Sequence, residues 1–431
     1  LAQKLCFAVN FRIRKEDTEL FLRNAQDKCP LSNRELWLFP DMLRLALLGG
    51  IYKASVELLE ILDRKRQEDI DKKTRLARLE QLMGNAITSL RQLSDLDFSE
   101  SFDKISITEQ ILNNDPAGVY ENMSLESKTY YRDLLSRMAK REGIPEYAMA
   151  EKLVSRASCE ADNRERHIGT ALLSYNMQRR AGQRRLYFLL LAVLPPAAAA
   201  AAGLLLSSYW ISALILLPLF EAVKSLLDYL AARLTCPVFL PRLDPLNLPA
   251  DASALTVISA LVTGKQAAGE LCERLEHFYR SNGDKGVIYG ILADLRESDK
   301  ETFSQQERDI VETLRQGVRE LNERLGVCFA LFVRGRRYCK TQRKYMGWER
   351  KRGAITELVR FIKGKPTSFE VAEGAIDKAR RCKYIVTLDS DTLLTIDSVR
   401  ELVGIMEHVA NQPEWDAPSC RVTRGYGMLQ P

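Results

Sequence analysis

A run of 35 residues without a charge, from Leu186 to Phe220, limits what this 431-residue chain can fold into. One membrane-spanning helix needs about 20 apolar residues, so the run is long enough for a tight hairpin of two spans. We predict a first span at Leu186–Leu206 and a second at Tyr209–Lys224, with the turn at the two serines between them. The alternative is a buried helical hairpin in a soluble core, although such cores rarely contain so long an uncharged stretch.

Positive charge beside the run predicts its orientation. Four arginines stand just before it, in the segment MQRRAGQRR, and the predicted turn carries no charge. Loops rich in Lys and Arg remain in the cytoplasm. We therefore expect both flanking regions to be cytoplasmic, with the hairpin crossing the lipid bilayer and returning.

The regions on either side of the hairpin differ in pattern. Residues 1–180 place apolar side chains at three- and four-residue spacing, which predicts a helical domain, and residues 181–230 contain the hairpin. In residues 231–431 short apolar runs alternate with amphipathic stretches, which predicts a parallel, Rossmann-like α/β sheet with crossover helices. The four strands that we expect are Ala254–Val262, Val287–Ala293, Val327–Val333 and Tyr384–Leu388.

Three carboxylates follow two of these strands. Asp294 comes after the second strand, and Asp389 and Asp391 come after the fourth. Parallel sheets bind ligands beyond the carboxyl ends of their strands, and Mg²⁺ or Mn²⁺ prefers oxygen ligands. We therefore predict a divalent metal held by Asp389 and Asp391. The simpler alternative is that these aspartates are helix caps or turn residues, which Asp favours.

Two further enzyme and binding classes can be weighed from the residues. A haloacid-dehalogenase-type phosphatase requires Thr four residues after its first Asp. This chain has Leu393 at that position, which argues against a phosphatase of this class. The formal charge of +6 is small for the length and does not argue for nucleic acid. Nine cysteines without a CxxC pair indicate reduced thiols rather than a disulfide framework.

A basic segment lies between the third and fourth expected strands. From Arg334 to Arg352 it has nine Lys or Arg residues and one acidic residue. Its early arginines could neutralise a pyrophosphate or form a solvated loop near anionic lipid. The later stretch WERKRG is a better binding candidate, because it combines an aromatic ring, basic groups and a glycine that permits close backbone approach.

Six stretches stand out in the sequence: NFRIRKEDTELFLRNAQDKCPLSNRELWLFPDMLRLALL, NDPAGVYENMS, LPRLDP, YMGWERKRGAITEL, TLDSDT and GYGMLQP. Together they resemble the cyclic β-1,2-glucan synthases, large inner-membrane enzymes of bacteria with a family-84 glycosyltransferase module. The resemblance implies a GT-A fold, UDP-glucose as donor, a β-glucan acceptor, and an inverting transfer that builds β-1,2-linked glucan. It also implies a multi-pass protein of the bacterial inner membrane with a cytoplasmic catalytic domain.

The resemblance also implies roles for individual residues. Asp389 and Asp391 match the catalytic metal-binding D-x-D, and Asp294 matches an acid that contacts uridine. The first strand departs from the family pattern, because it reads VISALVTG where a proline is usual. Lys351, Arg352 and Gly353 match a basic segment with glycine near the diphosphate, and Gln430 in MLQP is similar to a strand that lines the donor and acceptor cleft. Trp348, whose aromatic ring can stack, is the remaining donor-binding candidate.

An inverting transfer needs a base to deprotonate the acceptor hydroxyl. The resemblance places this base after the LQP strand, which would fall beyond Pro431. The chain starts at Leu1 without Met, and we expect an N-terminal fragment with a truncated GT-A domain and no activity alone. The alternatives are a membrane-anchored nucleotide-sugar-binding or scaffolding fragment, or a synthase of another β-glucan.

Overall fold

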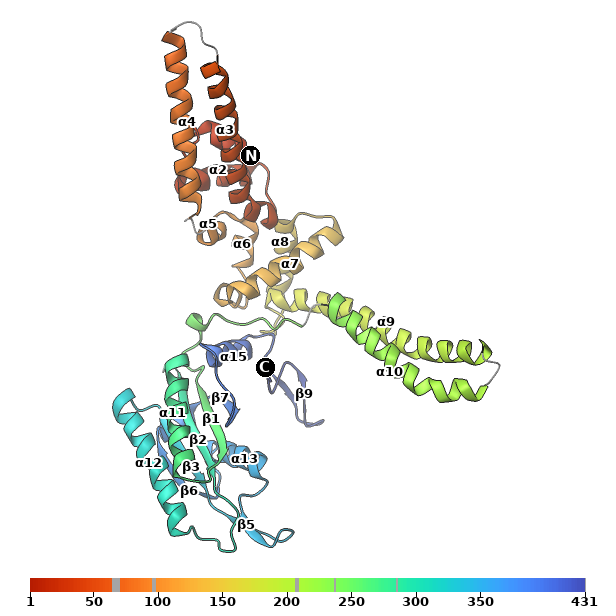
Figure 1. Cartoon of the computed structure of the whole chain (residues 1–431), viewed down its shortest axis with the longest axis vertical. Helices are drawn as coiled ribbons and strands as arrows, with labels where there is room; N and C mark the ends of the chain where they lie inside the picture. The colour runs from red at the N-terminus through yellow and green to blue at the C-terminus, as the bar shows by residue number, and fades with distance from the viewer. Residues whose placement is uncertain (64–69, 95–97, 206–208, 236–237, 284–285, 431) are drawn as a thin grey trace. The chain divides into compact units, whose positions relative to one another are not determined.

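A computed structural model of the chain shows two compact units (Figure 1). The first comprises Leu1–Glu121 and Lys128–Pro237, and the second comprises Asn122–Ser127 and Val238–Pro431. The structure describes residues 1–63, 70–94, 98–205, 209–235, 238–283 and 286–430.

The first unit is helical, as the spacing of its apolar residues predicts. Leu36, Leu43 and Leu47 lie on one side of the long helix α3 and are fully buried. They belong to a core that also contains Leu22 of α2. The helices before the hairpin are α1 (Ala2–Ala8), α2 (Lys15–Lys28), α3 (Asn33–Asp63), α4 (Ile70–Ser94), α5 (Phe98–Ile105), α6 (Ile107–Leu112), the 3-10 turn η1 (Tyr120–Asn122), α7 (Leu125–Glu142) and α8 (Glu146–Ser158).

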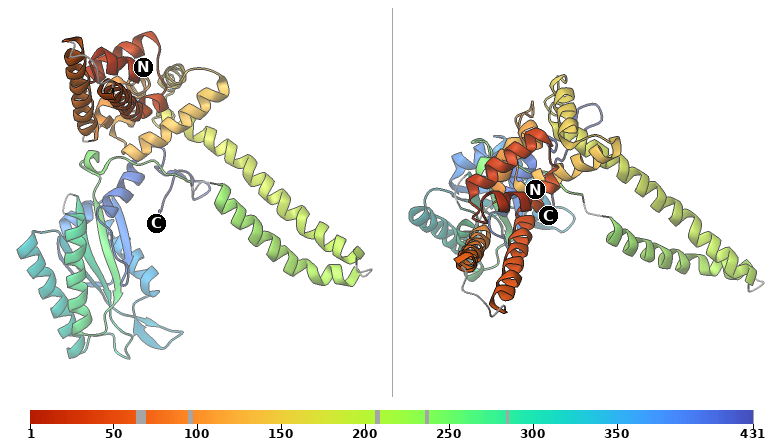
Figure 2. Two further views of the ribbon diagram at one scale, coloured as in Figure 1. Left: turned by 45° about the horizontal axis from the view of Figure 1, so that its top comes forward. Right: turned by 90° about the horizontal axis from the view of Figure 1, so that it is seen from above.

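The uncharged run forms two helices that lie side by side (Figure 2). Helix α9 (Ile168–Leu205) begins well before Leu186, and α10 (Tyr209–Leu234) returns along it. Within the described residues, α9 is the one helix that is long and apolar enough to cross a bilayer. The run thus forms two packed helices, whereas the prediction that they are two membrane spans joined by a tight turn stays a prediction. The predicted turn at Ser207 and Ser208 lies outside the described residues.

A buried polar cluster holds the first turn of α9. The Asp115 carboxylate accepts hydrogen bonds from the backbone N–H of Ile168 at 3.0 Å and of Tyr120 at 3.1 Å. His167 Nδ1 lies 2.7 Å from Asp115 Oδ2, and His167 Nε2 lies 3.1 Å from the hydroxyl of Tyr131. The side chains of Asp115 and His167 are completely buried, so this cluster fixes the helix start without contact with solvent.

The second unit is built on a five-stranded sheet of order β6-β3-β2-β1-β7. Strands β1, β2, β3 and β7 are parallel, and β6 pairs with β3 antiparallel. The four predicted strands are confirmed, and with them the mixed α/β class. Their bounds are β1 (Ala254–Leu261), β2 (Val287–Asp294), β3 (Phe329–Arg334), β6 (Phe369–Gly374) and β7 (Tyr384–Asp389).

Helices connect the strands. Helix α12 (Gln305–Leu325) begins at a capping box formed by Ser304 and Glu307, and it ends before Gly326, whose φ of 101° suits glycine. Helices α11 and α12 pack against each other and against β2 and β3. The other elements are η2 (Pro245–Asn247), α11 (Lys265–Asn282), α13 (Arg350–Ile362), α14 (Ile376–Arg381), α15 (Ser398–Glu407), and the hairpins β4–β5 (Arg337–Cys339, Lys344–Met346) and β8–β9 (Glu414–Asp416, Arg421–Arg424).

The strand order reverses between β1 and β7. From β1 the chain adds β2 and β3 on one side, and it then returns to the other side of β1 to form β7. Ser259 pairs with Asp389 and Leu261 pairs with Asp294, so the ends of β2, β1 and β7 are neighbours. Open α/β sheets bind ligands outside the carboxyl ends of the strands at such a reversal.

Candidate functional site

A cavity opens at the carboxyl edge of the sheet. Its volume is about 430 Å³, which is within the range of small-molecule sites. Leu261 and Asp294 contribute the ends of β1 and β2, and the rest of the lining comes from the loop after β2 and from residues 344–350. The lining residues are Leu261, Asp294, Leu295, Arg296, Glu297, Lys344, Met346, Gly347 and Arg350.

Asp389 and Asp391 lie at the end of β7, the strand next to β1, whose last residue, Leu261, lines this cavity. Asp389 is the last residue of the strand, and its carbonyl oxygen accepts a hydrogen bond from the backbone N–H of Thr392 at 3.1 Å. This turn brings Asp391 just beyond the strand, where both aspartates are exposed. Lys351 on α13 forms an ion pair with the Asp389 carboxylate. The structure thus brings together two predicted carboxylates and one predicted basic residue.

The chemistry of these donors can be compared with the needs of Mg²⁺ or Mn²⁺. Both ions take oxygen ligands, and Mg²⁺ is commonly held by one or two carboxylates together with substrate phosphates. Two exposed carboxylates on one turn fit that mode. In the described part of the chain, no group of three or more His, Cys, Asp or Glu side chains gathers to hold a metal. The pair therefore fits a metal whose coordination a phosphate ligand completes.

Asp294 reaches the same edge but is directed to an arginine. Arg334, the last residue of β3, donates from Nε to Asp294 Oδ1 at 2.7 Å and from Nη2 to Asp294 Oδ2. The Arg334 side chain is 1% exposed and the Asp294 side chain 15%. The third predicted carboxylate is therefore paired with a buried cation. Its contact with uridine stays a prediction.

The predicted WERKRG segment comprises the last two residues before α13 and the first turn of that helix. Trp348, Lys351 and Arg352 are exposed, and Arg352 forms an ion pair with Glu349 at 3.2 Å. Gly353 is buried, and a Cβ there would lie 1.7 Å from the carbonyl oxygen of Trp348. The close backbone approach expected of this glycine is thus observed, within the protein itself. The contact of these residues with a diphosphate stays a prediction.

Arg334 and Arg336 belong to the early arginines, for which we expected either contact with a pyrophosphate or a place in a solvated loop. The structure shows a different role for both. Both are buried, and Arg336 pairs with Glu307 at the start of α12. Burial raises the pKa of Glu307, but hydrogen bonds from Arg336 and Ser304 outweigh it and hold that pKa below its usual range. These two arginines therefore support the site from inside, whereas Arg337 is exposed.

Gln430 lies away from the cavity lining. It is exposed in a segment without regular structure, after the β8–β9 hairpin, and the described residues that line the cavity do not include it. The structure therefore does not bring Gln430 together with the other candidates. Its place in a donor and acceptor cleft stays a prediction.

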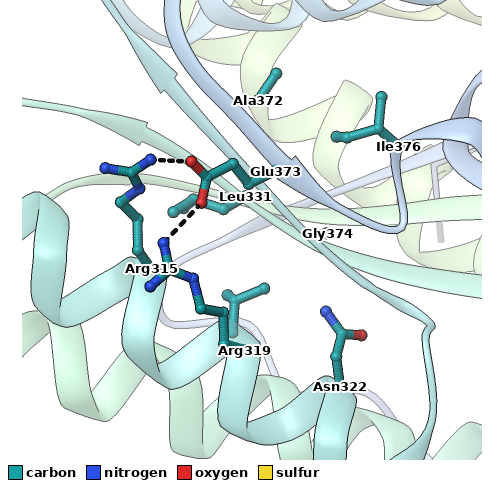
Figure 3. A pocket seen from close by; sticks show the side chains of 9 residues that line it. Arg315, Arg319, Asn322, Leu331, Ala372, Glu373, Gly374 and Ile376 are labelled. Carbon is teal, nitrogen blue, oxygen red and sulfur yellow. Dashed lines mark hydrogen bonds and ion pairs between the residues drawn. The ribbon is translucent and has the colours of Figure 1, made fainter.

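A second cavity, of about 340 Å³, lies between α12 and β6 (Figure 3). Glu373 forms ion pairs with Arg315 and Arg319 along its wall. Gly374, at the end of β6, pairs with Ala330 near the start of β3, so this cavity lies toward the amino edge of the parallel strands. It is separate from the carboxylates at the carboxyl edge.

Sequence reasoning missed Arg296 and Glu297, and it placed Arg334 in a basic segment without predicting its pairing with Asp294. Arg334 directly follows the apolar run Phe329–Val333, and this is the same signal that pointed to Asp294. Arg296 and Glu297 follow Asp294 by two and three residues and also line the cavity. The rule that ligands bind beyond strand ends could have found all three.

Comparison with known proteins agrees with the motifs. No family model matches the chain. Among curated proteins, the chain is similar to cyclic beta-(1,2)-glucan synthase NdvB of Rhizobium meliloti (strain 1021), with 28% identity. The match covers 81% of this chain and 14% of that much longer protein. The resemblance seen in the sequence is therefore confirmed, and the chain is related to a curated cyclic β-(1,2)-glucan synthase.

Proposed function

We propose that the second unit is the donor-binding part of a GT-A-type membrane glycosyltransferase. The whole enzyme transfers glucose from UDP-glucose to a growing β-1,2-glucan with inversion, in the presence of Mg²⁺ or Mn²⁺. One observation carries this proposal: Asp389 and Asp391 end a core strand beside the point where strand order reverses. The similarity to a cyclic beta-(1,2)-glucan synthase supports glucan as the product.

Different residues around the carboxylates bind the uridine and the diphosphate of a nucleotide sugar. The cavity beside Asp294 receives the uridine, with Leu261, Leu295 and Met346 as apolar walls. Lys351 lies in the first turn of α13, where the helix dipole also favours anions, and it binds the diphosphate. The metal held by the two aspartates would stabilise the negative charge that develops on the departing diphosphate.

Nucleotide binding is the first test of this function. We expect UDP to bind in the presence of Mn²⁺ and to lose most of its affinity in excess chelator, because the metal links the carboxylates to the phosphates. Calorimetry with UDP, and with CMP as a control that lacks both uracil and the second phosphate, measures this. Equal affinity with and without chelator would contradict the metal role.

Glucose transfer separates the proposal from its alternatives. Membranes that express the full-length gene are incubated with radiolabelled UDP-glucose, and the linkage of the product is read by methylation analysis. β-1,2-Linked glucan supports the proposal. UDP-glucose binding without incorporation would favour a scaffolding role, and another linkage would favour a synthase of a different β-glucan.

A topology experiment tests membrane insertion. We propose that α9 and α10 cross the bacterial inner membrane as two spans with the catalytic unit in the cytoplasm. The support is the charge pattern, because arginines precede the uncharged run and the serine turn has none. Reporter fusions at Gln183 and Asp244 should both report cytoplasm. A periplasmic signal at Asp244 would indicate a single span and would contradict the cytoplasmic placement of the sheet.

A further inference from the structure

Arg334 makes four hydrogen bonds at the edge of the sheet while it is itself buried. Two of them go to the oxygens of Asp294. The other two go to backbone carbonyls of the next loop: Nη1 donates to Trp348 O at 2.8 Å, and Nη2 donates to Arg350 O at 3.0 Å. One guanidinium thus joins the end of β2 to the loop that starts α13.

The backbone that contacts this guanidinium adopts a strained conformation. Glu349 and Arg350 are consecutive residues with left-handed φ angles of 47° and 45°, a region that side chains other than glycine rarely adopt. Such strain persists only where the surroundings hold it, and it gathers at functional sites. The carbonyl on each side of Glu349 is held by Arg334.

Two glycines leave the space that Arg334 fills. A Cβ at Gly347 would lie 2.5 Å from Arg334 Nη2, and a Cβ at Gly353 would lie 2.8 Å from Arg334 Nη1. Neither glycine has a positive φ, so close approach, and not backbone freedom, accounts for them. The segment from Gly347 to Gly353, which includes the first turn of α13 and is called the loop below, therefore leaves space for the Arg334 guanidinium.

We propose that Arg334 is the positioning residue of the donor pocket, an inference that rests on the proposed function. Arg334 does not line the cavity, but it bonds to Asp294 and Arg350, which do, and it sets the first turn of α13, which carries Lys351. The guanidinium orients the uridine side and the diphosphate side of the pocket together. Lysine cannot replace it, because a single ammonium group lacks the planar, forked donor geometry.

The alternative explanation is that Arg334 contributes only to stability. Buried ion pairs are weak sources of stability, since apolar replacements of both partners are often neutral or stabilising. A stabilising role alone predicts that any folded variant binds donor normally. The positioning role predicts that a folded variant loses both the order of the loop and affinity for the donor.

The test compares Arg334→Lys with Arg132→Lys in the full chain. Arg132 is a matched control, because it is also buried and paired with a carboxylate, Glu109, but it lies in the first unit. Hydrogen exchange reports the order of residues 347–353, and calorimetry reports the affinity for UDP with Mn²⁺. For Arg334→Lys we expect the loop amides to exchange about tenfold faster or more. The Kd for UDP should rise about 10- to 100-fold, by analogy with the loss of metal affinity or activity when the hydrogen-bond partners of metal ligands are mutated. Arg132→Lys should change neither quantity.

A second variant keeps the test informative if Arg334→Lys does not fold. Gly347→Ala retains the guanidinium but places a methyl group 2.5 Å from Nη2, and it should loosen the same loop and weaken UDP binding. The inference is overturned if a folded variant shows wild-type exchange in this loop, or UDP affinity within twofold of wild type. If the wild-type chain itself binds no UDP, the proposed function fails, and this inference fails with it.

Discussion

Under the proposed function, replacement of Asp391 by Asn is expected to abolish glucose transfer while the protein stays folded. Asn preserves the size of the side chain but removes one of the two negative charges at the end of β7. Asp391 is exposed in a turn, so the change should leave the sheet intact. Loss of one metal-binding carboxylate can cost several kcal/mol of barrier stabilisation, and 1.36 kcal/mol corresponds to a factor of ten in rate. We therefore expect a decrease of at least about 100-fold in kcat/KM.

The matched control is Asp377→Asn. Asp377 is also exposed, but it lies on α14, which follows β6 at the opposite edge of the sheet. Incorporation of labelled glucose should be the same for this variant and wild type. Activity of Asp391→Asn within threefold of wild type, or full wild-type activity in excess chelator, would refute the metal assignment.

Replacement of Asp115 by Ala should strongly destabilise the first unit. The buried carboxylate accepts hydrogen bonds from His167 and from the backbone N–H groups of Val119, Tyr120 and Ile168. Its removal leaves buried donors without an acceptor, and breaking a buried pair costs about 3–5 kcal/mol. Native-state hydrogen exchange across the start of α9 measures the loss. The control is Asp133→Ala, an exposed residue of α7, which should change stability by less than about 0.5 kcal/mol.

The same carboxylate predicts a dependence on pH. Burial raises the pKa of Asp115, but hydrogen bonds from His167 and from backbone N–H groups outweigh it and hold the pKa below the ordinary 3.8. A carboxyl group whose pKa is lower in the folded state contributes stability above its unfolded pKa and loses it as pH falls through the folded value. The stability difference between wild type and Asp115→Ala should therefore shrink below about pH 4. A difference that is constant from neutral pH to pH 3 would contradict the ionised role of Asp115.

The parallel strands and their terminal carboxylates could be predicted because local pattern decides them. Tyr384–Leu388 is a short apolar run followed at once by polar residues, and a buried parallel strand has that form. Strand β6 was missed because FEVAEG is a short edge strand that contains two glutamates and is neither continuously apolar nor strictly alternating. The short hairpins β4–β5 and β8–β9 were missed because three- and four-residue strands in charged segments carry little periodic signal.

The relation between the strands could not be read from local pattern. Composition gives no order for β1, β2, β3 and β7, so the reversal beside Asp389 emerges only from the pairing in space. The partner of Asp294 was hidden for the same reason, because Arg334 is 40 residues away in sequence. A charged residue at a strand end can be recognised from the sequence. Whether it meets solvent, a ligand or an opposite charge depends on tertiary contacts.

Helix α9 is much longer than the uncharged stretch that it contains. Its 38 residues give a length of about 57 Å at 1.5 Å per residue. The first 18 residues, Ile168–Arg185, precede the uncharged run and extend for about 27 Å. Because Asp115 accepts a hydrogen bond from the first residue of α9, this end of the helix is held in protein. Under the proposed insertion, the other end lies in lipid, and a change in the tilt of α9 would therefore act first on the contacts of Asp115 with the start of the helix.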